Sequence, residues 1–371
     1  MWFNAKKKMP DDTKRLLIFL CQKGRDQEAC REVERIVSLG YDLAFFDDKS
    51  LLTPLLLALD CDTCEPEIAK IIFAASKNAW QRGVFGFTTL HAAAKSQEFI
   101  EILEFAIKRT PNIDEPMGEE SSNTALGLAA MNLNEQGIVA LLQSGASLAA
   151  GSGAAAAGWS STGWNGALKY KSNFHSYLKD DRLLERCLNR LIEGGLQIND
   201  SIEHNFRKAT MLDAVIHDWN LRGNAIQQSD GDFQARKLNL LLRNGANPSI
   251  SYGQGRDQSP FSGNTLHICK WSEQIAILLD YGADPYSVDT NGRTVLHAVI
   301  GCRDHSQRLE EALLRSNFSR SRLDDRYAQF LRTHQSAPRS LMESLKQAEF
   351  SPFIKDPDRQ RKIAFLGTLL R

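Results

Sequence analysis

Three groups of residues in this sequence have types and spacings that could do chemistry: recurring histidines, a close pair of cysteines and a glycine-rich stretch. His91, His267 and His297 each follow a leucine in similar short segments. The eight histidines do not form the His-Glu-x-x-His spacing of a zinc protease or another ligand pattern. A histidine that recurs in this way is typical of a structural hydrogen bond. We therefore assign these three to the fold and not to catalysis.

The cysteine pair is Cys61-Asp-Thr-Cys64, which has the C-x-x-C spacing of zinc and redox sites. A zinc site needs a second pair of ligands at short range, and the sequence offers none there. The stretch from Gly151 to Gly153 lacks the Gly-Lys-Ser/Thr segment that grips phosphate and magnesium in a phosphate-binding loop. A Gly-x-Ser-x-Gly elbow and a kinase signature are also missing. We predict no catalytic residue, no metal, no cofactor and no small-molecule substrate.

The composition excludes several classes of protein. The 371-residue chain balances 45 Lys and Arg against 45 Asp and Glu, which argues against a protein that coats nucleic acid or an anionic membrane. The seven cysteines are dispersed and odd in number, unlike a disulfide framework. The longest apolar run near the N-terminus, Leu16–Cys21, is too short for a secretory core or a membrane span. We expect a cytoplasmic protein with a sizeable core, no nucleic-acid partner and no membrane span.

Similar segments recur along the chain, and these repeats must position the residues above. A threonine at the start of a copy, such as Thr88 or Thr294, is a good N-cap for the helix that follows. The glycine that closes a copy suits a helix end, because glycine adopts the left-handed conformation without strain. The first two spacings between leading leucines are 35 and 36 residues, and the next two are longer. The leading leucines are Leu55, Leu90, Leu126, Leu168 and Leu212, and the best closing glycines are Gly145, Gly245 and Gly282.

This pattern resembles the ankyrin repeat, whose period is about 33 residues. The resemblance rests on the threonine-leucine-histidine segments and on the Gly-Ala-Asx-Pro segments at 245–248 and 282–285. It implies an all-α fold: a solenoid of helix-turn-helix units with β-hairpin fingers, about eight irregular repeats in all. The domains expected are an N-terminal extension at 1–12, the repeat array at 13–317, and at 318–371 a helical C-terminal cap or small module.

Insertions interrupt the expected array near residues 147–166, 221–234 and 251–262. The first is rich in glycine and alanine, and we interpret it as a flexible or extended finger that carries Trp159 and Trp164. These tryptophans either contact a partner or pack the insertion onto its own repeats.

The seventh repeat is shorter than its neighbours. Only 15 residues separate His267 from Gly282, whereas 18 separate Gly127 from Gly145 in a better-formed copy. We expect one helix of the seventh repeat to be about a turn short.

By resemblance, ankyrin arrays bind partner proteins on a concave surface of hairpin fingers and inner helices. Aromatic and arginine side chains are the usual anchors of such interfaces. We therefore predict a non-catalytic protein-interaction module. The expected partner-binding residues are Arg82, Phe85, Phe87, Trp159, Trp164, Val288, Asn291 and Arg293. The expected structural repeat residues are Thr88, His91, Gly145, Gly245, His267, Gly282, Thr294 and His297.

Three finer interpretations stay open. The irregular repeats resemble ankyrin effectors that intracellular bacteria deliver into host cells, which would place the chain in the host cytosol. The tail resembles a SOCS box at Leu341, which would make the chain a substrate adaptor of a ubiquitin ligase. Leu345 and Glu349 depart from that motif, and an amphipathic capping helix gives the same pattern. The third is an enzyme with a site in the tail or the middle insertion.

Overall fold

The computed structural model divides by its internal contacts into two compact units, which we call unit 1 (Met1–Gln197) and unit 2 (Ile198–Arg371). The residues that the structure describes are 7–61, 64–76, 81–83, 86–118, 123–160, 181–204, 207–222, 228–249, 251–252, 263–289, 291–334, 341–348, 350, 352 and 354–370.

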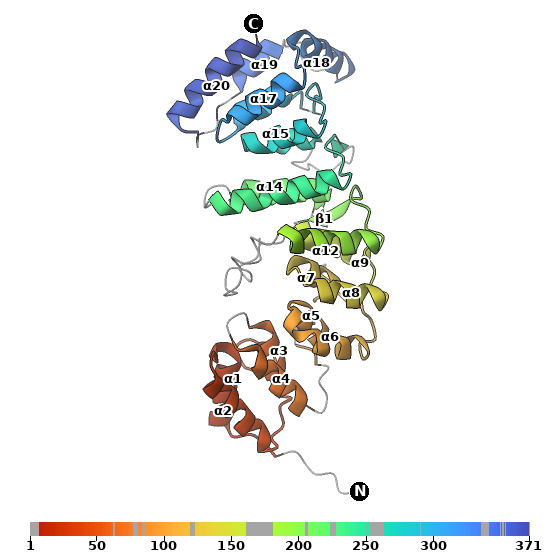
Figure 1. Cartoon of the computed structure of the whole chain (residues 1–371), viewed down its shortest axis with the longest axis vertical. Coiled ribbons are helices and arrows are strands. Elements are labelled where there is room, and N and C mark those ends of the chain that lie inside the picture. The colour runs from red at the N-terminus through yellow and green to blue at the C-terminus, as the bar shows by residue number, and fades with distance from the viewer. Residues whose placement is uncertain are drawn as a thin grey trace. The chain divides into compact units, whose positions relative to one another are not determined.

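Unit 1 consists of successive helix pairs, as α5 with α6 and α7 with α8 show in Figure 1. The first helix of each pair contacts the first helix of the next pair, and we call these helices inner and their partners outer. The inner helices are α1 (Asp11–Lys23), α3 (Pro54–Asp60), α5 (Thr89–Ala94), α7 (Ala125–Met131) and α9 (Ala150–Ser160). The outer helices are α2 (Gln27–Ser38), α4 (Pro66–Ala75), α6 (Ile100–Ile107) after the short 3₁₀ helix η1 (Gln97–Phe99), α8 (Glu135–Gln143) and α12 (Asp181–Glu193).

Threonine caps fix where the inner helices begin. The side chains of Thr53, Thr88 and Thr124 each accept a hydrogen bond from the backbone N–H three residues further along. Leucine and alanine follow each cap, and α5 is buried along its whole length. The small alanines let successive inner helices pack closely, while each buried leucine contributes roughly 2 kcal/mol of hydrophobic stabilisation.

Glycine ends the outer helices in the conformation that the sequence predicts. Gly145 has a φ of 89°, and Gly245 and Gly282 in unit 2 have values of 88° and 83°. Directly after α8 in the chain, the N–H groups of Gly145 and Ala146 donate to carbonyls of the last helical turn. These bonds satisfy carbonyl groups that have no partner within the helix.

The glycine-alanine insertion is helical, and the prediction of a flexible or extended finger is wrong for its first part. Residues Ala150–Ser160 form α9, which packs along α7. A Cβ atom at Gly127 or at Gly158 would collide with the backbone of the facing helix. The small residues therefore allow two helix backbones to approach closely. The glycine and alanine content alone does not distinguish this close packing from a flexible segment.

Unit 2 contains helix pairs and two short antiparallel hairpins. Strand β1 (Ile202–His204) pairs with β2 (Arg207–Ala209), and β3 (Ser251–Tyr252) pairs with β4 (Gly263–Asn264). The inner row consists of α13 (Met211–Arg222), the 3₁₀ helix η2 (Thr265–Ile268) and α16 (Val295–Gly301). The outer row consists of α14 (Gln228–Arg243), α15 (Ser272–Asp280) and α17 (Gln307–Arg315).

The shortened repeat is confirmed, and its short helix is the inner one. The 3₁₀ helix η2 has four residues, whereas α7 and α16 have seven each. Within each unit the prediction of an all-α fold of stacked, ankyrin-like helix-turn-helix units is also confirmed.

Three further helices follow α17 and contact the last repeat of unit 2: α18 (Arg320–His334), α19 (Leu341–Gln347) and α20 (Asp356–Leu369). The Tyr286 hydroxyl donates to the carbonyl of Asn317 and accepts from the N–H of Ser319, at 2.9 Å each. From α20, the buried Lys362 donates to the carbonyl of Cys302 at 2.8 Å. These bonds hold residues beyond 317 against the repeat.

Candidate functional site

The recurring histidines close the caps of two inner helices. The N–H of Thr88 donates to Nδ1 of His91, so in the neutral ring Nε2 carries the proton. That Nε2 donates to the carbonyl of Glu115, 2.9 Å away in the loop of the next repeat. Burial lowers the pKa of His91, which keeps the ring neutral at physiological pH. A histidine used in this way links two neighbouring repeats and has no proton to exchange with a substrate.

His297 has the same arrangement at the last repeat. The N–H of Thr294 donates to Nδ1 of His297 at 3.0 Å, and Nε2 lies 3.0 Å from the Ser344 hydroxyl on α19. Burial lowers the pKa of His297 to about 4. The tail helix α19 therefore supplies the acceptor that the loop of a following repeat supplies to His91.

The segment before α5, in which Arg82 pairs with Thr88, presents an exposed arginine. Arg82 pairs with Thr88 in an isolated antiparallel bridge, and the N–H of Gly83 donates to the carbonyl of Phe87 at 2.7 Å. The side chain of Arg82 is 45% exposed and forms an ion pair with Glu115. The ring of Phe87 stacks near that of His91 and is half-buried. Phe85, also predicted to contact a partner, lies outside the described residues.

Trp159 does not lie on a binding surface, and its assignment as a partner contact is wrong. Its side chain is 0% exposed, and its indole N–H donates to the carbonyl of Leu184 on α12 at 3.3 Å. The alternative interpretation, in which the tryptophan packs its insertion onto the repeats, holds for this residue. Trp164 lies outside the described residues.

The second predicted hairpin is organised by a buried carboxylate. Asp289 accepts hydrogen bonds from the N–H groups of Asn291 and Arg293, and its second oxygen accepts from Nε of Arg293 at 2.7 Å. Val288 pairs with Thr294 and is half-buried, whereas Asn291 is exposed. The aromatic ring of Phe330 on α18 lies against the hairpin at Gly292.

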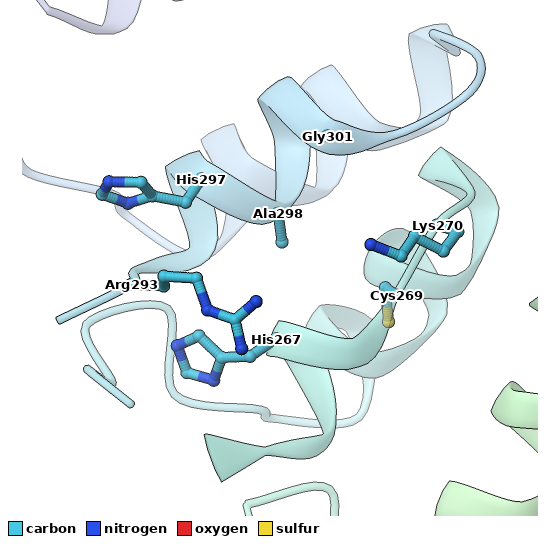
Figure 2. Close-up of a pocket in the computed structure, with 7 residues that line it drawn as sticks. All are labelled: His267, Cys269, Lys270, Arg293, His297, Ala298 and Gly301. Atoms are coloured by element: carbon cyan, nitrogen blue, oxygen red, sulfur yellow. The ribbon is translucent and has the colours of Figure 1, made fainter. Parts of the chain in front are cut away.

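A pocket of about 40 Å³ lies beside this hairpin, between η2 and α16 (Figure 2). In Figure 2 the guanidinium of Arg293 extends toward His267, whereas the ring of His297 turns away from the other side chains. Only His267, Arg293 and His297 of the lining were singled out from the sequence. The lining residues are His267, Cys269, Lys270, Arg293, His297, Ala298 and Gly301.

The cysteine pair is a structural feature of a helix-helix turn. The N–H of Cys64 donates to Sγ of Cys61 at 3.1 Å. A hydrogen bond with Cys61, together with burial, raises the pKa of the Cys64 thiol far above its usual value, so this thiol stays protonated. Across the described ranges, no three His, Cys, Asp or Glu side chains gather in a group that could hold a metal ion.

Asp213 is a buried acid that the sequence analysis did not identify. Asp213 stands in α13 where His91 stands in α5, one residue after the leading leucine. Its carboxylate accepts from the N–H of Thr210 at 3.2 Å and from the Thr210 hydroxyl at 3.1 Å. The Thr-x-x-Asp spacing is that of a capping motif and could have identified it.

No family model and no curated protein matches this sequence. Among solved structures, the crystal structure of the human ASB11 ankyrin repeat domain is similar to 61% of this chain and covers 96% of its own, with 19% sequence identity and a TM-score of 0.32. In the part of the chain described, every helix is too short or too polar to cross a membrane.

Proposed function

We propose that this chain is a non-catalytic interaction module that binds a partner protein through the hairpins and inner helices of its repeats. The observation that carries the proposal is the exposed Arg82 on a hairpin whose backbone is hydrogen-bonded on both sides. A segment whose backbone is already hydrogen-bonded loses little backbone entropy when it binds, which favours affinity. Arginine is also among the residues that contribute most to protein interfaces.

The chemistry of the repeats supports binding and not catalysis. The imidazoles of His91 and His297 are engaged in caps, and burial lowers the pKa of both. Buried cysteines such as Cys64 are protonated at physiological pH. A catalytic base or nucleophile needs a pKa near the working pH and access to substrate, and these groups have neither.

The proposed surface of unit 1 contains Arg82 and Phe87, and that of unit 2 contains Val288, Asn291 and Arg293. Phe85 and Trp164 remain proposed contacts from the sequence. The resemblance to delivered ankyrin effectors adds a proposed setting, the host cytosol, which a translocation reporter fused to the chain tests directly.

The ubiquitin-ligase adaptor is less well supported. A SOCS-like helix must offer its leucine to the ligase, but Leu341 is 3% exposed and Leu345 is also buried in this chain. The tail would have to leave the last repeat before it could bind a ligase, and we do not propose that function.

Proximity labelling with the full chain tests the binding proposal. The variant Arg82→Glu should lose a specific set of labelled proteins, because it reverses the charge at an exposed position of the proposed surface. The matched control is Arg15→Glu, which makes the same change at an exposed position on α1. If the original chain and Arg82→Glu label the same proteins, this hairpin is not the binding surface.

A further inference from the structure

The pocket between η2 and α16 shares only Arg293 with the proposed partner surface, and we attribute its existence to the shortened repeat. Helix η2 ends at Ile268, so the turn that a longer inner helix would add is missing. Helix α16 contributes His297 and the small residues Ala298 and Gly301 to the lining. A Cβ atom built on Gly301 would meet no other atom within 4 Å, so open space lies beside this residue.

Positive charge dominates the lining of this pocket. Lys270 and Arg293 both contribute to the lining, and Figure 2 shows the Lys270 amine directed toward the space below Ala298. Asp289 lies behind Arg293 and accepts from its Nε atom, which offsets one of the two charges. The Nη groups of Arg293 and the Nζ group of Lys270 make no hydrogen bond within the described residues.

His267 also lines the pocket and is a buried polar residue. Its side chain is 6% exposed, and neither ring nitrogen makes a hydrogen bond of normal geometry. The reason lies in the cap: Asn264 replaces the threonine found before His91 and His297. The Asn264 side chain accepts from the N–H of Leu266 and donates to the hydroxyl of Ser287, so it does not bond the ring as the hydroxyl of Thr88 bonds Nδ1 of His91.

A buried polar group without a partner costs about 1–3 kcal/mol, and a ligand that supplies the partner recovers this cost. The ligand must be an acceptor, because Lys270 and Arg293 are obligate donors and a protonated His267 also donates. It must also be small. A volume of about 40 Å³ is a few times the roughly 15 Å³ that one water needs, and far below the roughly 300–1,000 Å³ of drug-sized sites.

We propose that this pocket binds a small tetrahedral oxyanion of the phosphate class through Lys270, Arg293 and His267. The site goes beyond the partner-binding function and does not depend on it. Because Arg293 and Lys270 come from two consecutive repeats, the bound anion would also join them.

Anion binding should strengthen as the pH falls. Burial lowers the pKa of His267, while Asp289 and the adjacent backbone of Asn264 and Ser287 act in the opposite direction. The charge of Arg293 lowers the pKa of His267. His267 in turn contributes to the lowered pKa of His297. On the other side of η2, Asp213 approaches from α13 and bonds Thr265. A bound anion favours the charged imidazole, so by linkage protonation of His267 must tighten binding.

Isothermal titration calorimetry of the full chain with inorganic phosphate, in a phosphate-free buffer at constant ionic strength, tests the site. Lys270→Gln removes an exposed amine without disturbing the core and should weaken binding about tenfold. Gly301→Leu fills the pocket with no change of charge and should abolish binding. The control, Lys355→Gln, makes the same change of charge at an exposed residue just before α20 and should bind like the original chain.

The pH dependence is measured with sulfate between about pH 5 and pH 7, because sulfate keeps its charge there and the pKa of His267 is lowered below its ordinary value. Tighter sulfate binding at the lower pH, lost in His267→Gln, is the expected result. No saturable binding of phosphate or sulfate would overturn the proposal, as would equal affinity in the original chain, Lys270→Gln and Gly301→Leu. Since Lys270 is exposed, its variant remains informative even if Gly301→Leu does not fold.

Discussion

The buried carboxyl group of Asp213 should destabilise the folded chain at neutral pH, and this loss of stability can be measured. Its side chain is 2% exposed, at the first turn of α13, where it bonds the N–H and the hydroxyl of Thr210. Burial raises the pKa of Asp213 from 3.8 to about 6, although its hydrogen bonds with Thr210 and Thr265 act against this. Desolvation therefore outweighs the hydrogen bonds, and the folded chain holds an unfavourable charge at neutral pH.

The magnitude follows from linkage. The folded pKa lies above the unfolded one, so the stabilising contribution of Asp213 is complete below about pH 4 and is lost as the pH rises through about 6. A rise of roughly two pKa units corresponds to about 3 kcal/mol. An asparagine at this position would keep an acceptor for the N–H of Thr210 and cannot ionise. We expect Asp213→Asn to be nearly neutral at about pH 4 and to stabilise unit 2 by up to about 3 kcal/mol at pH 8.

Urea denaturation of the full chain at these two pH values measures the difference, and hydrogen exchange of peptides from 207–222 assigns it to α13. Hydrogen exchange is needed because repeat arrays often unfold in more than one step. Asp325→Asn, an exposed change on α18, is the control and should show little dependence on pH. If Asp213→Asn changes stability by the same amount at both pH values, the carboxyl is not destabilised by burial, and the reasoning fails.

Three further outcomes are expected. Trp159→Ala should lower the free energy of unfolding by about 3–5 kcal/mol, measured by denaturation, because it empties a buried site; an unchanged stability would contradict the buried position. Gly282→Ala should destabilise by about 1 kcal/mol because its φ is positive, whereas Gly367→Ala within α20 should stabilise by a similar amount; thermal melts that rank the two in the opposite order would refute this. Deletion of α19 and α20 should raise the pKa of His297 from about 4 toward 6.5, since desolvation lowers it. Histidine NMR titration would show no shift if the tail does not cover this ring.

The repeated framework was predictable because its signals are local. A threonine cap such as Thr88 and a closing glycine such as Gly145 each act within one helical turn, so their spacing in the sequence fixes where helices begin and end. The short inner helix was predictable for the same reason, because a missing turn shortens the interval from His267 to Gly282.

Features that depend on a distant partner were not predictable. The Gly/Ala segment of α9 is interpreted as flexible from its own composition, and only the facing Gly127 on α7 explains why small residues are needed there. Similarly, the orphaned ring of His267 depends on Ser287, which binds Asn264 from the following loop. Neither contact occurs at a fixed spacing in the sequence, so a sequence motif cannot predict it.

The bond between His297 and Ser344 sets a rule for engineering this chain. His91 donates a hydrogen bond from Nε2 to the loop of the following repeat, whereas His297 donates the corresponding hydrogen bond to α19. An additional repeat grafted directly behind α17 must therefore bring its own carbonyl for His297, or the graft will leave a buried donor without an acceptor. Fusions placed after α20 avoid this exchange. A repeat can thus be added at this junction only if a hydrogen-bond acceptor for His297 is kept.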